Sequence, residues 1–235
     1  DFHGCNTKTM ICFPTTVDCH TAHPVYQIPF GSMERKPYFE IPHEEVDTAE
    51  YLKHNMDYET AKGDWPALNW VDYSDWNGGL TVANNGTPGH QLKSGNIMVA
   101  LLRSGTRILD GNLMPEKGSF ENGAHEYEFA FRSHEPNNIC EAEQLGQLLN
   151  HPARAVAESL PEGTLLAFSQ ENLAVSAIRR CENGILIRVY ETLGRYTTTS
   201  ISGSLTENKQ IYSAQADGSG LEEEKKDEAP AQLAE

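Results

Sequence analysis

Short runs in which apolar and polar residues alternate recur along the chain and predict β-strands. The clearest run is 125–132, where Tyr127, Phe129 and Phe131 share one face and charged residues take the other. We therefore expect one face of this strand to bury three aromatic side chains. The other predicted strands are 9–17, 25–30, 79–83, 96–102, 164–169, 173–179, 185–191 and 196–201.

Clusters of Gly, Pro, Asn and Asp separate these runs, as is typical of turns between strands. The step Glu182-Asn183-Gly184 stands between two of the strands, 173–179 and 185–191. Because Asn-Gly readily adopts the positive φ angles of primed turns, this step predicts an antiparallel hairpin.

One segment, 141–149, has the pattern of a helix. Asn137 and Asn138 precede it, and either residue type suits the N-cap position, where a side-chain oxygen accepts an N–H group of the first turn. The segment ends before His151-Pro152. The apolar stripe of this helix is expected to consist of Leu145, Leu148 and Leu149.

Many short strands and one short helix favour an all-β fold, an antiparallel β-sandwich, over a parallel sheet with crossover helices. A chain of 235 residues is long enough for one or two domains. We expect a large β-sandwich domain at 1–155, the strands of a second, smaller sheet at 156–215, and a disordered acidic tail at 216–235. The tail is too polar to offset the entropy of ordering it. Residues 34–64 form a long polar excursion between strands.

The charge balance restricts the partners of the chain. Its formal net charge is −16, which repels phosphate backbones and anionic headgroups. No apolar run approaches the roughly 20 residues that cross a bilayer. We therefore expect neither nucleic acid nor a membrane as a partner.

Cysteine usage favours a reducing compartment. The chain has five cysteines and no CxxC pair, whereas a disulfide framework normally leaves no thiol over. Reduced structural thiols, and hence a cytoplasmic location, are the expectation. The sequence starts at Asp1 without a signal-peptide pattern, and we interpret Asp1 as a cut end.

A metal site is one hypothesis for Cys12, Cys19, His20 and His23, because Cys and His are the usual zinc ligands. The spacing matches no standard zinc finger. Structural thiols are the favoured alternative, and we expect no metal ligands and no cofactor in this chain.

Other catalytic signatures are lacking. The sequence has no GxSxG motif, and Gly78-Gly79 leads into a predicted strand rather than a helix, unlike a phosphate-binding loop. Asn85-Gly86-Thr87 has the form of a glycosylation sequon, but a turn is the better interpretation. The aromatic residues Trp65, Trp70, Tyr73 and Trp76 suit either sugar stacking or core packing.

Six sequence blocks in one order resemble glycoside hydrolase family 38, the α-mannosidases. The segment 70–75 and the following 79–86 resemble the family's "WVDLS…GVALLND", and 123–134 is similar to its "DxGxHxFxYALxPH". The remaining blocks are 25–35, 97–104, 149–152 and 185–194, which resemble a β-domain opening, "LTLLRS", "LNxP" and "LRLYExxG". The resemblance covers about residues 10 to 205 and implies a galactose-mutarotase-like super-sandwich.

The chain departs from the family pattern at three places. Glu121 stands where the family has Asp before "GxH", the "ALxPH" segment reads Ala-Phe-Arg-Ser-His at 130–134, and a charged tail replaces the closing sheet.

The resemblance implies a function for the chain as a part of a larger enzyme. Family members are retaining enzymes whose zinc ligands, nucleophile and acid/base belong to an N-terminal α/β domain, which this sequence does not contain. The chain is thus expected to be the C-terminal β-sandwich part of an α-mannosidase that hydrolyses terminal α-mannosyl residues when joined to that zinc-dependent domain. Its expected partners are this catalytic domain and carbohydrate, as α-mannosides.

The resemblance implies no catalytic residue and no metal ligand here, and the chain alone is expected to be inactive. It is expected to support the catalytic domain and to contribute to one wall of the sugar pocket. Glu121, His125 and His134 are the candidate substrate-binding residues, with structural hydrogen bonding as the alternative role. Two other hypotheses are a structural interaction module and a free-standing carbohydrate-binding module, which requires Trp65, Trp70 and Trp76 to be exposed and aligned.

Overall fold

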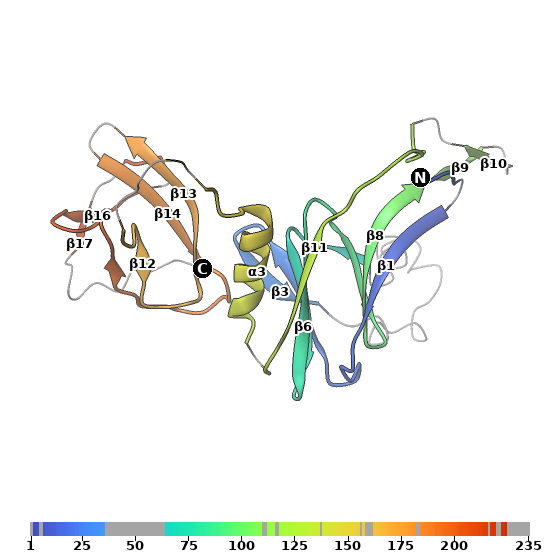
Figure 1. The fold of residues 1–235 in the computed structure, drawn as a ribbon, viewed down its shortest axis with the longest axis horizontal. Coiled ribbons are helices and arrows are strands. Elements are labelled where there is room, and N and C mark those ends of the chain that lie inside the picture. Colours follow the sequence, from blue (N-terminus) through green and yellow to red (C-terminus); the bar gives the residue numbers. More distant parts are fainter. Residues whose placement is uncertain are drawn as a thin grey trace, which may run out of the picture. The chain divides into compact units, whose positions relative to one another are not determined.

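A computed structural model shows a chain built mainly from antiparallel strands, with one helix among the described residues (Figure 1). The predicted all-β fold with one short helix is confirmed. No helix among these residues has the length and apolar character needed to cross a membrane. The structure describes residues 2–4, 7–35, 64–109, 112–115, 118–136, 138–155, 157, 162–181, 184–215, 217–219 and 222–224.

The chain divides into two compact units. The first consists of Asp1–Ile28 and Met33–Pro152, and the second of Pro29–Ser32 and Ala153–Glu235. The predicted domains at 1–155 and 156–215 stay a prediction, because compactness alone does not show that a unit folds independently. Most of the predicted excursion at 34–64 lies outside the described residues.

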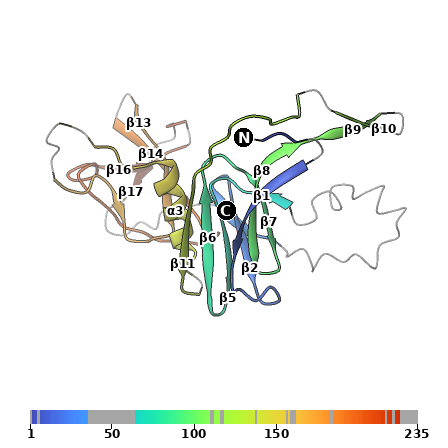
Figure 2. The same ribbon diagram turned by 45° about the vertical axis from the view of Figure 1, so that its right-hand side comes forward.

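Two antiparallel sheets form the first unit (Figure 2). The four-stranded sheet has the order β1 (Thr7–Pro14), β8 (Asn96–Ser104), β7 (Gly89–Lys93) and β4 (Asp64–Pro66). The five-stranded sheet has the order β11 (Phe129–His134), β6 (Gly78–Asn84), β5 (Trp70–Asp75), β2 (His23–Ile28) and β3 (Gly31–Glu34). A separate hairpin pairs β9 (Thr106–Leu109) with β10 (Asn112–Pro115).

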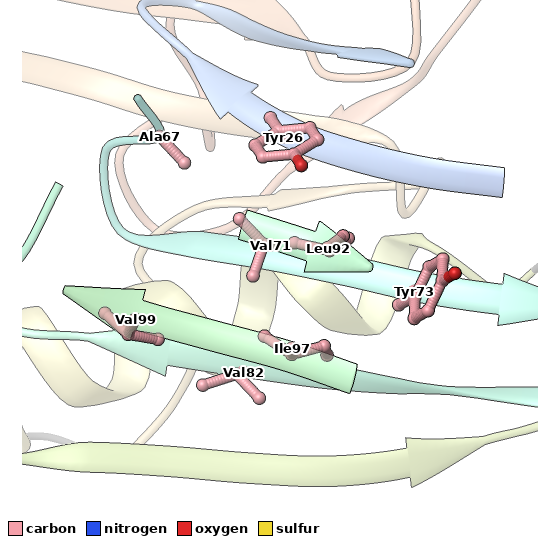
Figure 3. Close-up of a cluster of buried hydrophobic side chains, with 8 residues drawn as sticks. All are labelled: Tyr26, Ala67, Val71, Tyr73, Val82, Leu92, Ile97 and Val99. Atoms are coloured by element: carbon pink, nitrogen blue, oxygen red, sulfur yellow. The ribbon is translucent and has the colours of Figure 1, made fainter. Parts of the chain in front are cut away.

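The main core contains side chains from both sheets (Figure 3). Val71 and Tyr73 of β5 and Val82 of β6 are fully buried, and Ile97 and Val99 of β8 are buried with them. These positions alternate along each strand, as a half-buried strand requires. Burying each such side chain contributes roughly 1.5–3 kcal/mol of transfer free energy, so this layer holds the sandwich together.

The helix α3 (Cys140–Asn150) packs on β5, β6 and β11 around a second core of Trp70, Ala83, Ala142 and Leu145. Gly146 makes the close approach possible: a Cβ there would lie 2.7 Å from Cδ1 of Trp70. Strand β5 is therefore buried at all six positions.

The structure corrects two details of the predicted helix. The N-cap is Ile139, which makes no side-chain cap hydrogen bond, so Asn138 does not cap the helix; Asn137 lies outside the described residues. Leu145 is buried as predicted, but Leu148 is 60% exposed. The buried face instead turns toward Ala142 and Gly146, because Trp70 fills the space beneath them.

The predicted strand at 125–132 is wrong in its bounds, because β11 begins only at Phe129. Residues before it use their polar groups elsewhere: the Tyr127 hydroxyl donates to the Leu101 carbonyl at 2.8 Å. Phe131 is 67% exposed, so its ring is not buried as expected, although it lies 6.0 Å from the ring of Phe13.

The second unit consists of small two-stranded sheets. The predicted hairpin is present as β13 (Leu173–Cys181) and β14 (Gly184–Glu191), with Cys181 paired to Gly184. The predicted strands at 164–169 and 196–201 shrink to the short pair β12 (Ala167–Phe168) and β15 (Ile201–Ser202). In the predicted tail, β17 (Glu222–Glu224) pairs with β16 (Ile211–Ser213), and residues 225–235 lie outside the described residues.

Glu191 organises the turn that follows β14. Its carboxylate accepts the backbone N–H groups of Leu193 at 3.0 Å and Arg195 at 2.8 Å. The Asn172 amide donates to the same carboxylate and to Oγ1 of Thr197 at 2.7 Å. One side chain thus fixes the loop of the "YExxG" block, which makes this part of the block structural.

The burial pattern of α3 predicts unequal effects for two leucines of the same helix. Leu145→Ala should lower the free energy of unfolding by about 2–5 kcal/mol, because it leaves a cavity beside Trp70. Leu148→Ala, at an exposed position, should change it by less than about 0.5 kcal/mol. Urea denaturation of both variants checks this, and equal effects would contradict the packing of α3.

Candidate functional site

Glu121 and His125 lie together beside the end of β8. The backbone N–H of Arg103 donates to Oε2 of Glu121 at 2.5 Å, and Nε2 of His125 lies 2.9 Å from the Glu121 carbonyl oxygen. Because a carbonyl oxygen only accepts, Nε2 carries the proton. Both side chains are exposed. The two residues therefore hold a surface loop against β8.

Tyr127 continues this loop. Its ring stacks on that of His125, with centroids 6.2 Å apart. Loss of solvation raises the pKa of Tyr127, and the charge of Glu121 raises it further. The hydroxyl group thus stays protonated at neutral pH and keeps donating to the backbone.

His134, the third candidate, lies in a different place, at the end of β11, where it contacts Asp72 of β5. Nε2 of His134 lies 2.6 Å from Oδ2 of Asp72, and Nδ1 lies 2.8 Å from the carbonyl oxygen of Glu135. Since both partners are acceptors, both ring nitrogens must donate, and the ring is an imidazolium. The hydrogen bond to Asp72 is the main cause that raises the pKa of His134, although burial opposes it.

The ion pair between His134 and Asp72 is closed off from solvent. The side chain of His134 is 1% exposed and that of Asp72 is 0% exposed. Thr81 of β6 donates its hydroxyl to the same carboxylate oxygen at 2.5 Å. Three neighbouring strands, β5, β6 and β11, are thereby joined through a single oxygen atom.

Gly79 makes room for the pair. A Cβ at this position would lie 2.6 Å from Cε1 of His134 and 2.5 Å from Cβ of Ser74. Only a residue without a side chain lets the imidazole cross β6 to reach Asp72. The glycine of the "GVALLND"-like block therefore serves packing here, not the binding of a phosphate group.

The turn between β5 and β6 is held by Asp75. Its Oδ1 accepts the N–H of Asn77 at 2.7 Å and its Oδ2 that of Asp18 at 2.8 Å. These backbone hydrogen bonds, that from Asp18 first, lower the pKa of Asp75 below its usual value. Trp76, in the turn itself, is 72% exposed.

The aromatic residues do not form an exposed row. Trp70 is 1% exposed, and its Nε1 donates to Oε2 of the buried Glu143 at 2.9 Å. Trp65 packs partly buried at the core, with the Arg35 guanidinium 4.7 Å from its ring centroid. The hypothesis of a free-standing carbohydrate-binding module required Trp65, Trp70 and Trp76 to be exposed and aligned. This requirement is not met, because the helix α3 and the carboxylate of its Glu143 cover Trp70.

Asn84 and His90 form a polar connection inside the core. Nδ1 of His90 lies 2.9 Å from the Pro88 carbonyl oxygen, so it is the donor, and Nε2 then accepts from the Asn84 amide at 3.3 Å. Oδ1 of Asn84 also accepts the N–H of Thr87 at 2.8 Å. Desolvation by burial lowers the pKa of His90 to about 4. The ring is therefore neutral at physiological pH.

The Cys and His residues of the metal hypothesis separate in the structure. Sγ of Cys12 lies 3.5 Å from Oδ1 of Asn96, and Nδ1 of His23 lies 3.1 Å from Oε1 of Glu34. Cys19 and His20 stay together in the turn 18–21, where Asp18 joins them. The four cysteines of the described residues form no disulfide bond.

The arrangement is rich in hydrogen bonds that position loops. Both nitrogens of His134 are committed to protein acceptors, so this residue cannot transfer a proton to a substrate in this conformation. Sequence reasoning missed Asp72, Thr81 and Glu143, since their partners lie 9 to 116 residues away along the chain. Substrate binding by Glu121, His125 and His134 stays a prediction.

The burial of a neutral His90 predicts that the free energy of unfolding decreases as the pH falls. The folded-state pKa of His90 lies below the unfolded value of 6.5, so its neutral form stabilises the fold above that pH, and the stabilisation is lost as pH falls toward 4. The loss amounts to about 3 kcal/mol. His90→Gln should flatten the stability profile between pH 6.5 and 4 in urea denaturation. The exposed His151→Gln should leave the profile as in the wild type.

Removing the charge of Asp72 tests the buried pair. Asp72→Asn should lower the free energy of unfolding by about 3–5 kcal/mol below pH 6.5, because the imidazolium of His134 loses its partner. The folded pKa of His134 is raised, so the difference between variant and wild type should shrink as pH rises through that pKa. Glu126→Gln, at an exposed position, is the control. An Asp72→Asn penalty that does not depend on pH would show that His134 is neutral.

Comparisons with known proteins agree with this fold. The glycosyl hydrolases family 38 C-terminal domain matches residues 1–108. Alpha-mannosidase G of Dictyostelium discoideum is 22% identical over 190 residues, which are 77% of this chain and 15% of that protein.

Two solved structures from Enterococcus faecalis have the same fold. The crystal structure of an alpha-mannosidase has a TM-score of 0.60 and 18% identity, and covers 84% of this chain and 22% of that one. A protein in glycosyl hydrolase family 38 also has a TM-score of 0.60, with 17% identity over 85% of this chain and 22% of that one.

The chain thus spans 15% of the length of the curated relative and 22% of each solved chain. At these identities the solved structures show the fold alone. Residues 1–108 resemble the C-terminal domain of glycosyl hydrolase family 38, and 77% of the chain is similar to an alpha-mannosidase.

Proposed function

We propose that this chain is the C-terminal β-sandwich part of a retaining α-mannosidase. It acts on terminal α-mannosyl residues only when joined to an N-terminal, zinc-dependent catalytic domain. The observation that carries the proposal is the match to the family's C-terminal domain, together with a chain that spans only 15% of an alpha-mannosidase relative.

The carboxylates of the described residues support a role outside the reaction centre. Retaining glycosidases need two carboxyl groups about 5 Å apart, one as nucleophile and one as acid/base. Here the buried Asp72, Asp75 and Glu143 each accept hydrogen bonds from protein groups. None of these three is available for attack on a sugar, which favours a catalytic pair supplied by the other domain.

The catalytic zinc of the proposed enzyme belongs to that other domain too. Among the described residues, one group of three side chains has metal-ligating atoms close together, Asp18, Cys19 and His20. The carboxylate next to it, Asp75, has both oxygens held by backbone N–H groups. Because this turn offers no unoccupied carboxylate pair, it does not fit the catalytic metal centre.

The contribution of this chain is mechanical support and one part of the pocket wall. The loop that carries Glu121 and His125 is fixed to β8 by the hydrogen bond from the Arg103 N–H to the Glu121 carboxylate, and both side chains are exposed. Arg103 uses Oε2 of Glu121, which leaves the other oxygen to accept a sugar hydroxyl. His134 lies at the end of β11 and fixes the position of this strand through its contact with Asp72. A cytoplasmic location goes with this proposal.

Hydrolysis of an aryl α-mannoside tests the proposal. The purified 235-residue chain should show no zinc-dependent turnover of p-nitrophenyl α-mannoside, because the proposal places the catalytic carboxylate pair in the N-terminal domain. The longer polypeptide encoded when the reading frame is extended upstream of Asp1 should hydrolyse it with retention of configuration, and should leave the β-mannoside intact. Turnover by the chain alone, or an extended polypeptide without turnover, would overturn the proposal.

A further inference from the structure

The turn 18–21, which follows β1, brings together three different metal-ligating side chains. One ligand atom each of Asp18, Cys19 and His20 lies within 4.8 Å of the other two. Asp18 and His20 are exposed, and Cys19 is partly buried. Carboxylate, thiolate and imidazole are the donor types that zinc and similar divalent ions take in proteins.

The backbone of this turn is held in place before any ion binds. The N–H of Asp18 donates to the buried Asp75 at 2.8 Å, the N–H of His20 donates to Oδ1 of Asp18 at 3.0 Å, and Thr21 donates to the Asp18 carbonyl at 3.1 Å. These bonds leave the second carboxylate oxygen of Asp18 for a cation. Since Asp75 also holds Asn77, the turn is anchored to the end of β5.

The surroundings of the turn favour a positive ion. Tyr73 is fully buried beside it, and its hydroxyl has no well-formed hydrogen bond among the described residues. Burial is the main cause that raises the pKa of Tyr73, and the charges of Cys19 and Asp18 add to it, which places these groups near the hydroxyl. Asp75 adds another negative charge, and the whole chain carries −16.

We propose that Asp18, Cys19 and His20 form a binding site for one divalent ion of the zinc type, with water in the fourth position. Ligand atoms around tetrahedral zinc lie about 3.3–3.8 Å from one another, as metal–ligand distances of about 2.0–2.3 Å require. The ligand atoms in the turn lie up to 4.8 Å apart, and rotation of the side chains brings them to these distances. The exposure of Asp18 and His20 permits this rotation.

The proposed site differs from the metal site considered in the sequence analysis. It uses Cys19 and His20 of the sequence-level metal hypothesis, but replaces Cys12 and His23 with Asp18, because β1 and β2 carry those two residues to other partners. Its role is structural: the ion fixes the side chains of the turn 18–21, whose backbone is already held by Asp75 at the end of β5.

Cobalt titration of the metal-free chain tests the site. Co²⁺ bound through Cys19 should give a near-ultraviolet thiolate-to-cobalt charge-transfer band, which Zn²⁺ removes by competition. Cys19→Ser should abolish this band, and His20→Gln should weaken Co²⁺ binding at least about tenfold, because a ligand is lost. Cys12→Ser, the matched control at another exposed thiol, should leave both band and affinity unchanged.

Thermal unfolding gives a second, independent measurement. Excess Zn²⁺ should raise the melting temperature of the wild type and of Cys12→Ser, since an ion that binds only the folded state stabilises it. Zn²⁺ should raise the melting temperatures of the Cys19→Ser and His20→Gln variants by less than it raises that of the wild type. Absence of the charge-transfer band in the wild type, its persistence in Cys19→Ser, or its loss in Cys12→Ser would overturn the proposal.

Discussion

Burial of β5 on both faces is the constraint on which the first unit depends. One face meets the core between the sheets and the other meets α3, so every position of the strand is withdrawn from water. A buried polar group costs several kcal/mol unless it is hydrogen-bonded. The polar residues Asp72 and Asp75 on this strand must therefore find partners inside the protein. The partner of Asp72 is the imidazolium of His134, which decides where β11 lies. The partners of Asp75 are the backbone N–H groups of Asp18 and Asn77, and the first of these decides where the turn 18–21 lies.

The same constraint holds the strands of this unit in one arrangement. A carboxylate that is desolvated and shared between two donors, as Asp72 is between His134 and Thr81, stabilises one arrangement of strands and is unavailable to a substrate. Glu143 does the same for α3 through Trp70 and Gln27. A sandwich held in this way is compatible with the supporting role proposed above.

Chemistry that remains available lies at the surface, on loops that this framework fixes. Glu121 is tied to β8 through its Oε2, which accepts the Arg103 N–H, and His125 contacts the Glu121 carbonyl oxygen through Nε2. The turn with Asp18, Cys19 and His20 is tied to β5 through Asp75. In both loops a hydrogen bond to a strand fixes the backbone, and the exposed side chains provide the functional groups. The candidate sugar-binding residues and the proposed metal site thus lie on different loops of one scaffold.

The sequence by itself determined the local features. The alternation of apolar residues predicted the strands, and Asn183-Gly184 predicted the hairpin. The order of six blocks indicated the resemblance to glycoside hydrolase family 38. All of these signals depend on neighbours along the chain. Only the tertiary structure decided what each polar residue does. Asp72 and His134 stand 62 residues apart, and Gln27 and Glu143 stand 116 apart, so no local pattern indicates that they meet. The exposure of Leu148 and Phe131 was likewise decided by packing against Trp70 and by the start of β11, since periodicity shows which residues share a face but not which face is covered.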